Sequence, residues 1–182
     1  MRNWADGPLD LQTERYLLRP LTARDAGGLL AHFGDPEVTE FMDIEPLRTL
    51  SQAQAVVAWA GGLLAQGGGV RWGVRARDGQ RLIGTCGFNA LELERGRRGE
   101  LAYDLAVAFW GQGVMREVLP AVLEFGFGRI GLRRIEAMVT DGNVRSTGLL
   151  ERLGFQCEGR LRDHGYWKGR FWDQLIYARL AS

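Results

Sequence analysis

The sequence predicts an α+β fold, with one mixed sheet of about seven strands flanked by about four helices. Two patterns carry this prediction: apolar residues recur at helical spacing in some segments and alternate with polar residues, as in strands, in others. The third observation is a strand–helix–strand order around residues 100–140, because such a crossover joins parallel strands.

The N-terminal elements follow from local signals. Residues 11–21 are predicted to form one extended segment. Thr22 is the predicted N-cap of a helix, with Asp25 at the third helical position, and that helix runs to about Gly34. A short helical turn is expected over residues 35–41.

A longer helix and three strands are expected next. Ser51 and Gln54 match a capping box, and apolar residues follow at helical spacing. Alternation then predicts a meander of strands, with Asp78-Gly79 as the hairpin turn between the first two. These strands cover residues 70–77, 81–91 and 100–107.

The C-terminal elements include the crossover. A turn containing Gly111 and Gly113 leads into a helix that ends near residue 129. Residues 126–131 match G-x-G-x-x-G, but they end a helix and precede a strand, whereas a dinucleotide-binding loop has the reverse order. The remaining expected elements are a strand at 132–140, a helix at 143–153 stopped by Gly154, and strands at 155–165 and 170–180.

Composition excludes several classes of protein. The formal net charge of +1 gives no basic field for nucleic acid, and no apolar run approaches the ~20 residues of a membrane span. Cys86 and Cys157 cannot build a disulfide framework and lack neighbours at metal-ligand spacing. A reduced, cytoplasmic protein without a metal is therefore expected.

The turn at Gly111-Gln112-Gly113 is a candidate anion site. The N–H groups that begin a helix have no intrahelical partners, and glycine lets a phosphate approach the backbone closely. An ordinary tight turn explains these glycines equally well. Whether the turn binds an anion must therefore be judged from other residues.

Residues 143–155 resemble the N-x-x-S/A-x-x-L-L/Y-E/K-K/R-x-G-F segment of the GNAT acetyltransferases. The run TERYLLRPL at residues 13–21 is similar to the opening of the RimJ/RimL branch, whose members acetylate the N-termini of ribosomal proteins. The resemblance extends over residues 11–180. Further matches in the family's order and spacing are residues 100–103, 110–113 and 158–162, Asp173 and Tyr177.

This resemblance implies a single GNAT domain over residues 1–182, with 1–10 as an N-terminal extension. Its sheet would splay open and hold acetyl-CoA in the gap. The pyrophosphate would bind the backbone amides of Gln112, Gly113, Val114, Met115 and Arg116. The pantetheine arm would pair with free backbone groups of Leu105, Ala106 and Val107, and a backbone N–H near Val107 would bind the thioester oxygen. Asn143 and Ser146 would meet the cofactor from the other side.

Two positions depart from the family pattern. Met115 stands where Gly or Ala is usual, so its side chain is expected to narrow the space beside the phosphate. Leu150 stands where many relatives have a Tyr that protonates the departing thiolate. Ser146, one helical turn earlier, is the predicted substitute.

Glu100 is the first candidate for the general base that deprotonates the attacking amine. A salt bridge from Glu100 to Arg97 or Arg98 is an equally good explanation of this residue. Asp163 and His164 on the penultimate strand are the alternative base, since a histidine titrates in a useful range. The predicted walls of the acceptor pocket are Phe41, Met42, Trp72, Phe88, Tyr166, Trp167 and Trp172.

The leading hypothesis is transfer of an acetyl group from acetyl-CoA to a primary amine, by direct attack in a ternary complex. The acceptor would be a protein N-terminus, as in the RimJ/RimL branch, or a small-molecule amine. The alternative is a non-catalytic acyl-CoA-binding sensor or scaffold module. The resemblance implies a monomer or a homodimer.

Overall fold

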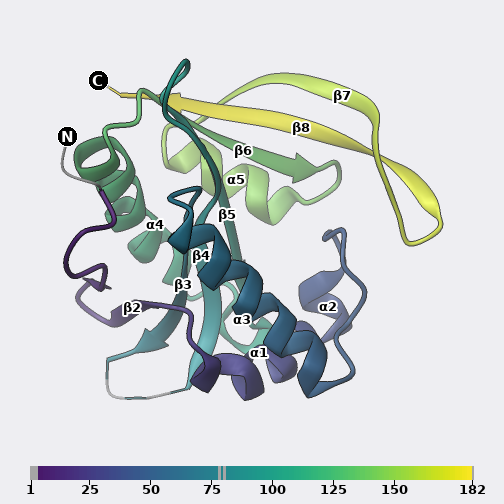
Figure 1. Ribbon diagram of the computed structural model, residues 1–182. Helices are drawn as coiled ribbons and strands as arrows, with labels where there is room; N and C mark the ends of the chain where they lie inside the picture. The colour runs from purple at the N-terminus through teal and green to yellow at the C-terminus, as the bar shows by residue number, and fades with distance from the viewer. Residues whose placement is uncertain (1–3, 78, 80, 182) are drawn as a thin grey trace.

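The computed structural model describes residues 4–77, 79 and 81–181, and within them the strands form one eight-stranded sheet of order β1-β2-β3-β4-β5-β6-β8-β7 (Figure 1). Neighbouring strands in this described sheet are antiparallel except for β5 and β6, which are parallel. The strands are β1 (Leu11–Gln12), β2 (Tyr16–Pro20), β3 (Val70–Ala76), β4 (Leu82–Glu92), β5 (Arg98–Leu105), β6 (Arg134–Thr140), β7 (Gln156–Trp167) and β8 (Arg170–Leu180).

The α-helices of the described chain are α1 (Ala26–Phe33), α2 (Pro36–Thr39), α3 (Leu50–Ala65), α4 (Val114–Glu124) and α5 (Val144–Arg152). Short 3-10 turns, η1 (Ala23–Asp25) and η2 (Val107–Phe109), precede α1 and α4, and a π-helical segment, η3 (Phe125–Ile130), extends α4. The mixed fold class is confirmed. None of the described helices has the length and apolarity that a membrane crossing requires.

The extra strand arises where one extended segment was predicted. Residues 11–21 turn back at Thr13, whose N–H donates to the carbonyl of Tyr16, so β1 pairs with β2. The Glu117 carboxylate on α4 holds this turn, because it accepts from the hydroxyl of Thr13 and from the backbone and side chain of Arg15. Glu117 is 102 residues from Arg15 in the sequence, so no local sequence pattern could predict this contact.

The capping signals were right for one helix and displaced for another. The Asp25 carboxylate accepts the Thr22 N–H at 2.8 Å, as predicted, and starts the turn into α1. Helix α3 begins two residues before the predicted box, with Thr49 as N-cap and Gln52 as its reciprocal partner. The predicted hairpin turn includes Asp78, which lies outside the described residues.

The predicted N-terminal extension packs on the core over residues 4–10. Trp4 is buried, and the guanidinium of Arg129 donates to the carbonyls of Trp4, Asp6 and Pro8. The indole of Trp72 donates to the carbonyl of Leu9 at 2.7 Å. The segment is therefore tied to η3 and to β3.

Apolar residues cover both faces of β3 to β5. Strand alternation sends Val70, Trp72 and Val74 into the larger core under α4, while Arg71 and Arg75 point to the face of α1 and α3. Arg75 pairs there with Asp25, and Arg71 pairs with Asp104 on β5. Each arginine is buried, and its ion pair satisfies the charge.

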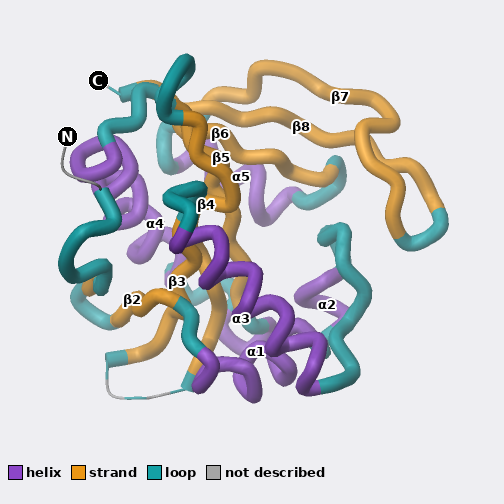
Figure 2. Tube along the Cα trace, viewed as in Figure 1, coloured by secondary structure: helices purple, strands orange, loops and turns teal. Residues whose placement is uncertain are grey.

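The sheet divides between β5 and β6. These parallel strands pair at Arg98–Arg134, Gly99–Ile135 and Glu100–Glu136, and their pairing within the described residues ends there. In Figures 1 and 2, β5 and β6 meet near one end and then diverge, with α5 beside β6. The crossover predicted the parallel pairing, and the wedge between the two strands is the gap that the family resemblance implied.

The G-x-G-x-x-G sequence lies in η3, at the end of the α4 helix, as its sequence context predicted. Gly131 closes this segment with φ of 76°, a left-handed conformation that favours glycine. The pattern therefore supplies a helix stop and does not begin a helix.

Gly87→Ala is expected to destabilise the protein by about 2–4 kcal/mol, since a Cβ at this position would lie 2.0 Å from the carbonyl oxygen of Val70 and φ is +147°. Urea denaturation followed by circular dichroism measures the change. The matched control is Gly61→Ala in the exposed middle of α3, where nothing lies within 4 Å and a gain of about 0.5–1 kcal/mol is expected. Equal effects of the two substitutions would contradict the prediction.

Candidate active site

A cavity of about 760 Å³ occupies the wedge between β5 and β6. Its lining comes from both faces of the sheet. On β5, Tyr103 points to the face of α5, where it bonds to Ser146, whereas Asp104 points to the face of α1, where it bonds to His32. Strand alternation places Glu100 on the same face as Asp104. The cavity therefore passes through the sheet from the face of α4 and α5 to the face of α1 and α2.

The start of α4 forms the anion-binding end of the cavity. Gly113 caps the helix with φ of 74°, and the backbone N–H of Glu117 makes the first intrahelical bond, to the carbonyl of Gly113. The preceding amides of Val114, Met115 and Arg116 have no acceptor within the helix, and all three residues line the cavity. With the positive end of the helix dipole, these amides suit a phosphate.

Ser146 and Tyr103 form a hydroxyl pair across the wedge. Ser146 lies in the first turn of α5, which Asn143 caps by accepting the Ser146 N–H at 3.2 Å. The two hydroxyl oxygens are 2.6 Å apart. Burial raises the pKa of Tyr103 to about 12, although the bond to Ser146 lowers it, so the phenol stays protonated at neutral pH. The pair can donate a proton to a group bound in the wedge.

Glu100 is half-buried at the closed end of the wedge. Burial raises the pKa of its carboxyl group above the usual value, and the negative charges of Glu136 and Asp43 raise it further. Glu136 is held in an ion pair with Arg134, but Glu100 makes no ion pair with any residue that the structure describes. The predicted alternative, a salt bridge to Arg97 or Arg98, is therefore absent from this described set.

A protein-family model for the acetyltransferase (GNAT) domain matches residues 15–156. The chain belongs to the GNAT acetyltransferase family. It is an enzyme of the N-acetyltransferase class, as the names of its relatives show.

This GNAT enzyme is similar to two named proteins in sequence and to a solved structure in fold. It is 38% identical over 168 residues to the uncharacterised N-acetyltransferase YoaA of Bacillus subtilis (strain 168), covering 92% of this chain and 94% of the relative. It is 28% identical over 174 residues to the ribosomal protein uS5-alanine N-acetyltransferase of Escherichia coli (strain K12), covering 92% and 89%. The fold matches Mycobacterium smegmatis RimJ in complex with CoA-disulfide at a TM-score of 0.87 and 20% identity, covering 97% and 89%.

Most of the predicted site residues of this GNAT enzyme line the cavity, and three do not. The three are Ala106, Val107 and Gln112. The N–H of Ala106 donates to the carbonyl of Ile83 at 2.8 Å, which corrects the expectation that this amide is free. The Gln112 side chain turns back to the carbonyl of Ala108. The predicted residues that do line the cavity are Glu100, Leu105, Gly113, Val114, Met115, Arg116, Asn143 and Ser146.

Met115 is 6% exposed and belongs to the core cluster beneath α4, so little of its side chain is left to narrow the space beside the phosphate as expected. Its N–H still lies at the start of the helix, among the cavity residues. Leu150 is fully buried in the same cluster. Tyr103 is the residue that sequence reasoning missed. The pattern placed it with Leu101 and Leu105 on an apolar face, but a buried tyrosine hydroxyl needs a partner.

Asp104 lies in a buried ion network behind the cavity. Its carboxylate is 2.6 Å from His32 Nε2 and 3.1 Å from Arg71 Nη2, and it accepts from the N–H and hydroxyl of Thr85. Burial alone would raise the pKa of Asp104, but His32, Arg71 and Thr85 together lower it. Each carboxylate oxygen of Asp104 already has two hydrogen-bond partners. Asp104 therefore holds β5 in place and is a poor acceptor for a further proton.

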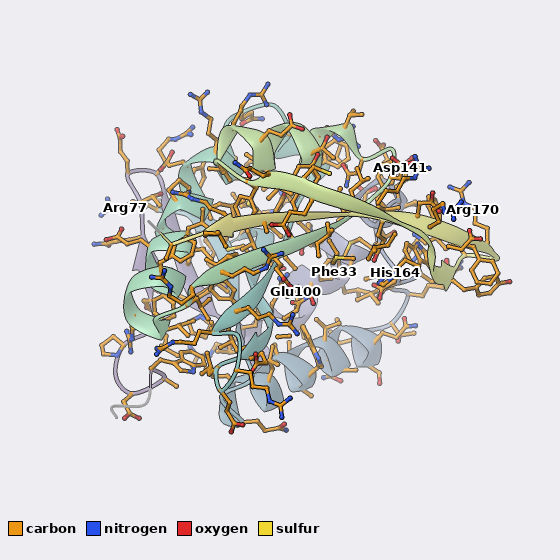
Figure 3. The ribbon with its side chains drawn as sticks, turned by 90° about the horizontal axis from the view of Figure 1, so that it is seen from above. Phe33, Arg77, Glu100, Asp141, His164 and Arg170 are labelled. Carbon is orange, nitrogen blue, oxygen red and sulfur yellow. The ribbon has the colours of Figure 1, made fainter. Side chains whose placement is uncertain are left out.

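The alternative base, Asp163 or His164, lies on the hairpin of β7 and β8, outside the cavity lining (Figure 3). A register shift between Leu161 and Gly165 interrupts the strand pairing there, and the Asp163 N–H donates to Asp173. Glu158, in the segment that matches the family at residues 158–162, pairs with Arg134. Asp163 and Glu158 therefore contact other strands of the sheet, away from the cavity lining.

The predicted walls of the acceptor pocket lie in several environments. Phe41, Met42 and Trp167 line the cavity, whereas Trp172 does not line it and stacks on Trp167. Trp72 and Phe88 are fully buried in the core, and Tyr166 is exposed at the hairpin end. Residue type alone did not separate these environments, because aromatic side chains suit all of them. Both cysteines are free: Cys86 is buried in the core, and Cys157 is exposed.

Proposed function

We propose that this protein transfers the acetyl group of acetyl-CoA to a primary amine by direct attack in a ternary complex. The wedge through the sheet carries this proposal, because it offers a base on one face and a proton donor on the other. The relatives named for N-acetyl transfer support the class of reaction.

The residues present fit coenzyme A. The amides of Val114, Met115 and Arg116 would hold its pyrophosphate, and the open approach at Gly111, where a Cβ would meet nothing within 4 Å, leaves room for the phosphates. Since the Ala106 N–H is turned to β4, alternation turns the N–H of Leu105 toward the wedge, where it would pair with the pantetheine arm. The carbonyl of Leu105 already accepts from the indole N–H of Trp110 at 2.7 Å, which corrects the expectation that both of its backbone groups are free. The cofactor supplies an activated acetyl group as a thioester.

Acetyl transfer then divides between the two faces. Glu100 takes the proton from the attacking ammonium, directly or through one water, on the face of α1 and α2. The Ser146–Tyr103 pair donates a proton to the departing thiolate on the face of α5. No enzyme nucleophile is needed, so mass spectrometry of the protein after reaction should show no acetylated serine or cysteine.

Ser146→Ala is expected to lower kcat about 10–100-fold while leaving acetyl-CoA affinity within about threefold of the parent value, since a proton donor acts in the transition state. Thiol release measures kcat and isothermal titration measures affinity. Thr147→Ala is the matched control, because its hydroxyl bonds to the carbonyl of Val144 on the exposed side of the same helix turn. An unchanged kcat in Ser146→Ala would remove the pair from the mechanism.

A sensor or scaffold that binds acyl-CoA without turnover is the competing function. Titration with acetyl-CoA, followed by thiol release against N-terminal peptides and small amines, separates the two. Binding without release for any acceptor would favour the sensor. Absence of binding would contradict both.

A further inference from the structure

The charged residues of the cavity are segregated by element. Its three arginines, Arg116, Arg145 and Arg152, lie on α4 and α5, at the end assigned to coenzyme A. The carboxylates come from the opposite face: Glu37 from α2, Asp43 from the loop after α2, and Glu100 from β5. Asp104 is also acidic, but its carboxylate already forms an ion pair with Arg71 and a hydrogen bond with His32.

The carboxylates at the acceptor end are not neutralised by neighbours. Within the described chain, Glu37, Asp43 and Glu100 belong to no ion pair. Asp43 is close enough to Glu100 that its negative charge raises the pKa of the Glu100 carboxyl group. Lys168 is a nearby cation, but its ammonium donates to the carbonyls of Thr39 and Glu40, and the residue does not line the cavity.

A second and independent feature belongs to the lining of the same cavity. Asn89 is one of the lining residues, and its amide oxygen is buried with no hydrogen-bond partner among the described residues. A buried acceptor without a partner costs free energy, which a bound donor recovers. An ammonium group has three donors and no acceptor, so it matches a site made of carboxylates and an amide oxygen.

We propose that the acceptor carries a second positive charge beside the amine that is acetylated, and that Asp43, with Glu37 and the amide oxygen of Asn89, binds this second cation. The inference rests on the proposed function, because it assigns Glu100 to the reacting amine. The amine that is acetylated must reach Glu100 and lose its proton, while the second amine remains a cation bound at the rim of the cavity. The aromatic faces of Phe41 and Trp167 line the same end and suit a cation with an alkyl chain.

Two sources supply this chemistry: a small diamine, or a peptide whose N-terminal amine is followed by a basic side chain. The indole N–H of Trp167 is also buried without a partner among the described residues, and a peptide carbonyl would satisfy it. The test therefore uses two acceptor pairs that each differ by one charge. They are 1,4-diaminobutane against 1-aminobutane, and the peptide Ala-Lys-Ala-Ala against Ala-Gln-Ala-Ala.

The parent protein should use the more charged member of at least one pair with a kcat/KM about tenfold higher, on the order expected for a close charge pair in a half-buried site. Asp43→Asn should reduce that preference to about threefold or less, chiefly through KM. The matched control is Glu45→Gln, two residues along the same loop and outside the cavity lining, which should keep the parent preference. Titration of each acceptor into protein saturated with coenzyme A gives the same comparison without turnover.

The outcomes separate the two proposals. Equal use and equal binding of both members of both pairs overturns this inference while leaving acetyl transfer intact. A preference that survives Asp43→Asn also overturns it. Failure to bind acetyl-CoA, or absence of thiol release with every acceptor, is instead a failure of the proposed function. Where acetyl-CoA binds without thiol release, the titration of the acceptors still decides whether a second cation is recognised.

Discussion

Glu100→Gln is expected to lower kcat for acetyl transfer by about 100-fold or more, with acetyl-CoA affinity retained, because general-base catalysis contributes about 10²–10⁴-fold. The amide keeps the size of the side chain and loses its basicity. Thiol release at saturating acceptor measures kcat, and titration of acetyl-CoA measures the affinity. His164→Ala is the control, since this residue is exposed on the hairpin and does not line the cavity.

The pH dependence follows from the environment of Glu100. Burial, then Glu136 and Asp43, raise its pKa, so the carboxyl group is still partly protonated above the usual pH range of a glutamate. A protonated carboxyl cannot accept a proton, so kcat/KM should fall as the pH is lowered through this raised pKa. Asp43→Asn should move that acid limb to lower pH. A limb that stays in place in Asp43→Asn and persists in Glu100→Gln would assign the base elsewhere.

Asp104→Asn is expected to destabilise the protein by about 3–5 kcal/mol, because removing one member of a buried ion network leaves the others uncompensated. His32 and Arg71 would keep their burial and lose their common partner. Urea denaturation at neutral pH measures the change. Asp10→Asn is the matched control, since its pair with Arg19 is exposed at 3.4 Å, and little change is expected there.

The sign of the pH effect on stability follows from the same network. The pKa of Asp104 is lower in the folded state than its ordinary value of 3.8, so the ionised carboxylate stabilises the fold above that value. This contribution is lost as the pH falls through the lower folded pKa. Asp104→Asn should therefore show a smaller loss of stability on acidification than the parent. Equal stability of Asp104→Asn and Asp10→Asn would contradict the role of the network.

Local sequence signals located most elements because their causes are local. Gly154, with φ of 80°, stops α5 where the pattern predicted, and Thr22 with Asp25 starts the first helical turn. The segment at residues 11–21 was misjudged because its bend depends on Glu117, a residue of another element. The α3 cap was displaced because Thr49-Gln52 and Ser51-Gln54 present the same spacing, and only packing chooses between them.

The sequence by itself determined the fold class, the family resemblance and the strand-to-helix turn, because periodicity, glycine conformation and spacing are properties of the chain. The tertiary structure decided which side chains meet across the wedge. Tyr103 and Ser146 are 43 residues apart in the sequence, and their hydroxyls meet because α5 lies across the wedge from β5. It likewise placed Met115 in the core and Asp43 near Glu100, since a side chain's surroundings depend on distant elements.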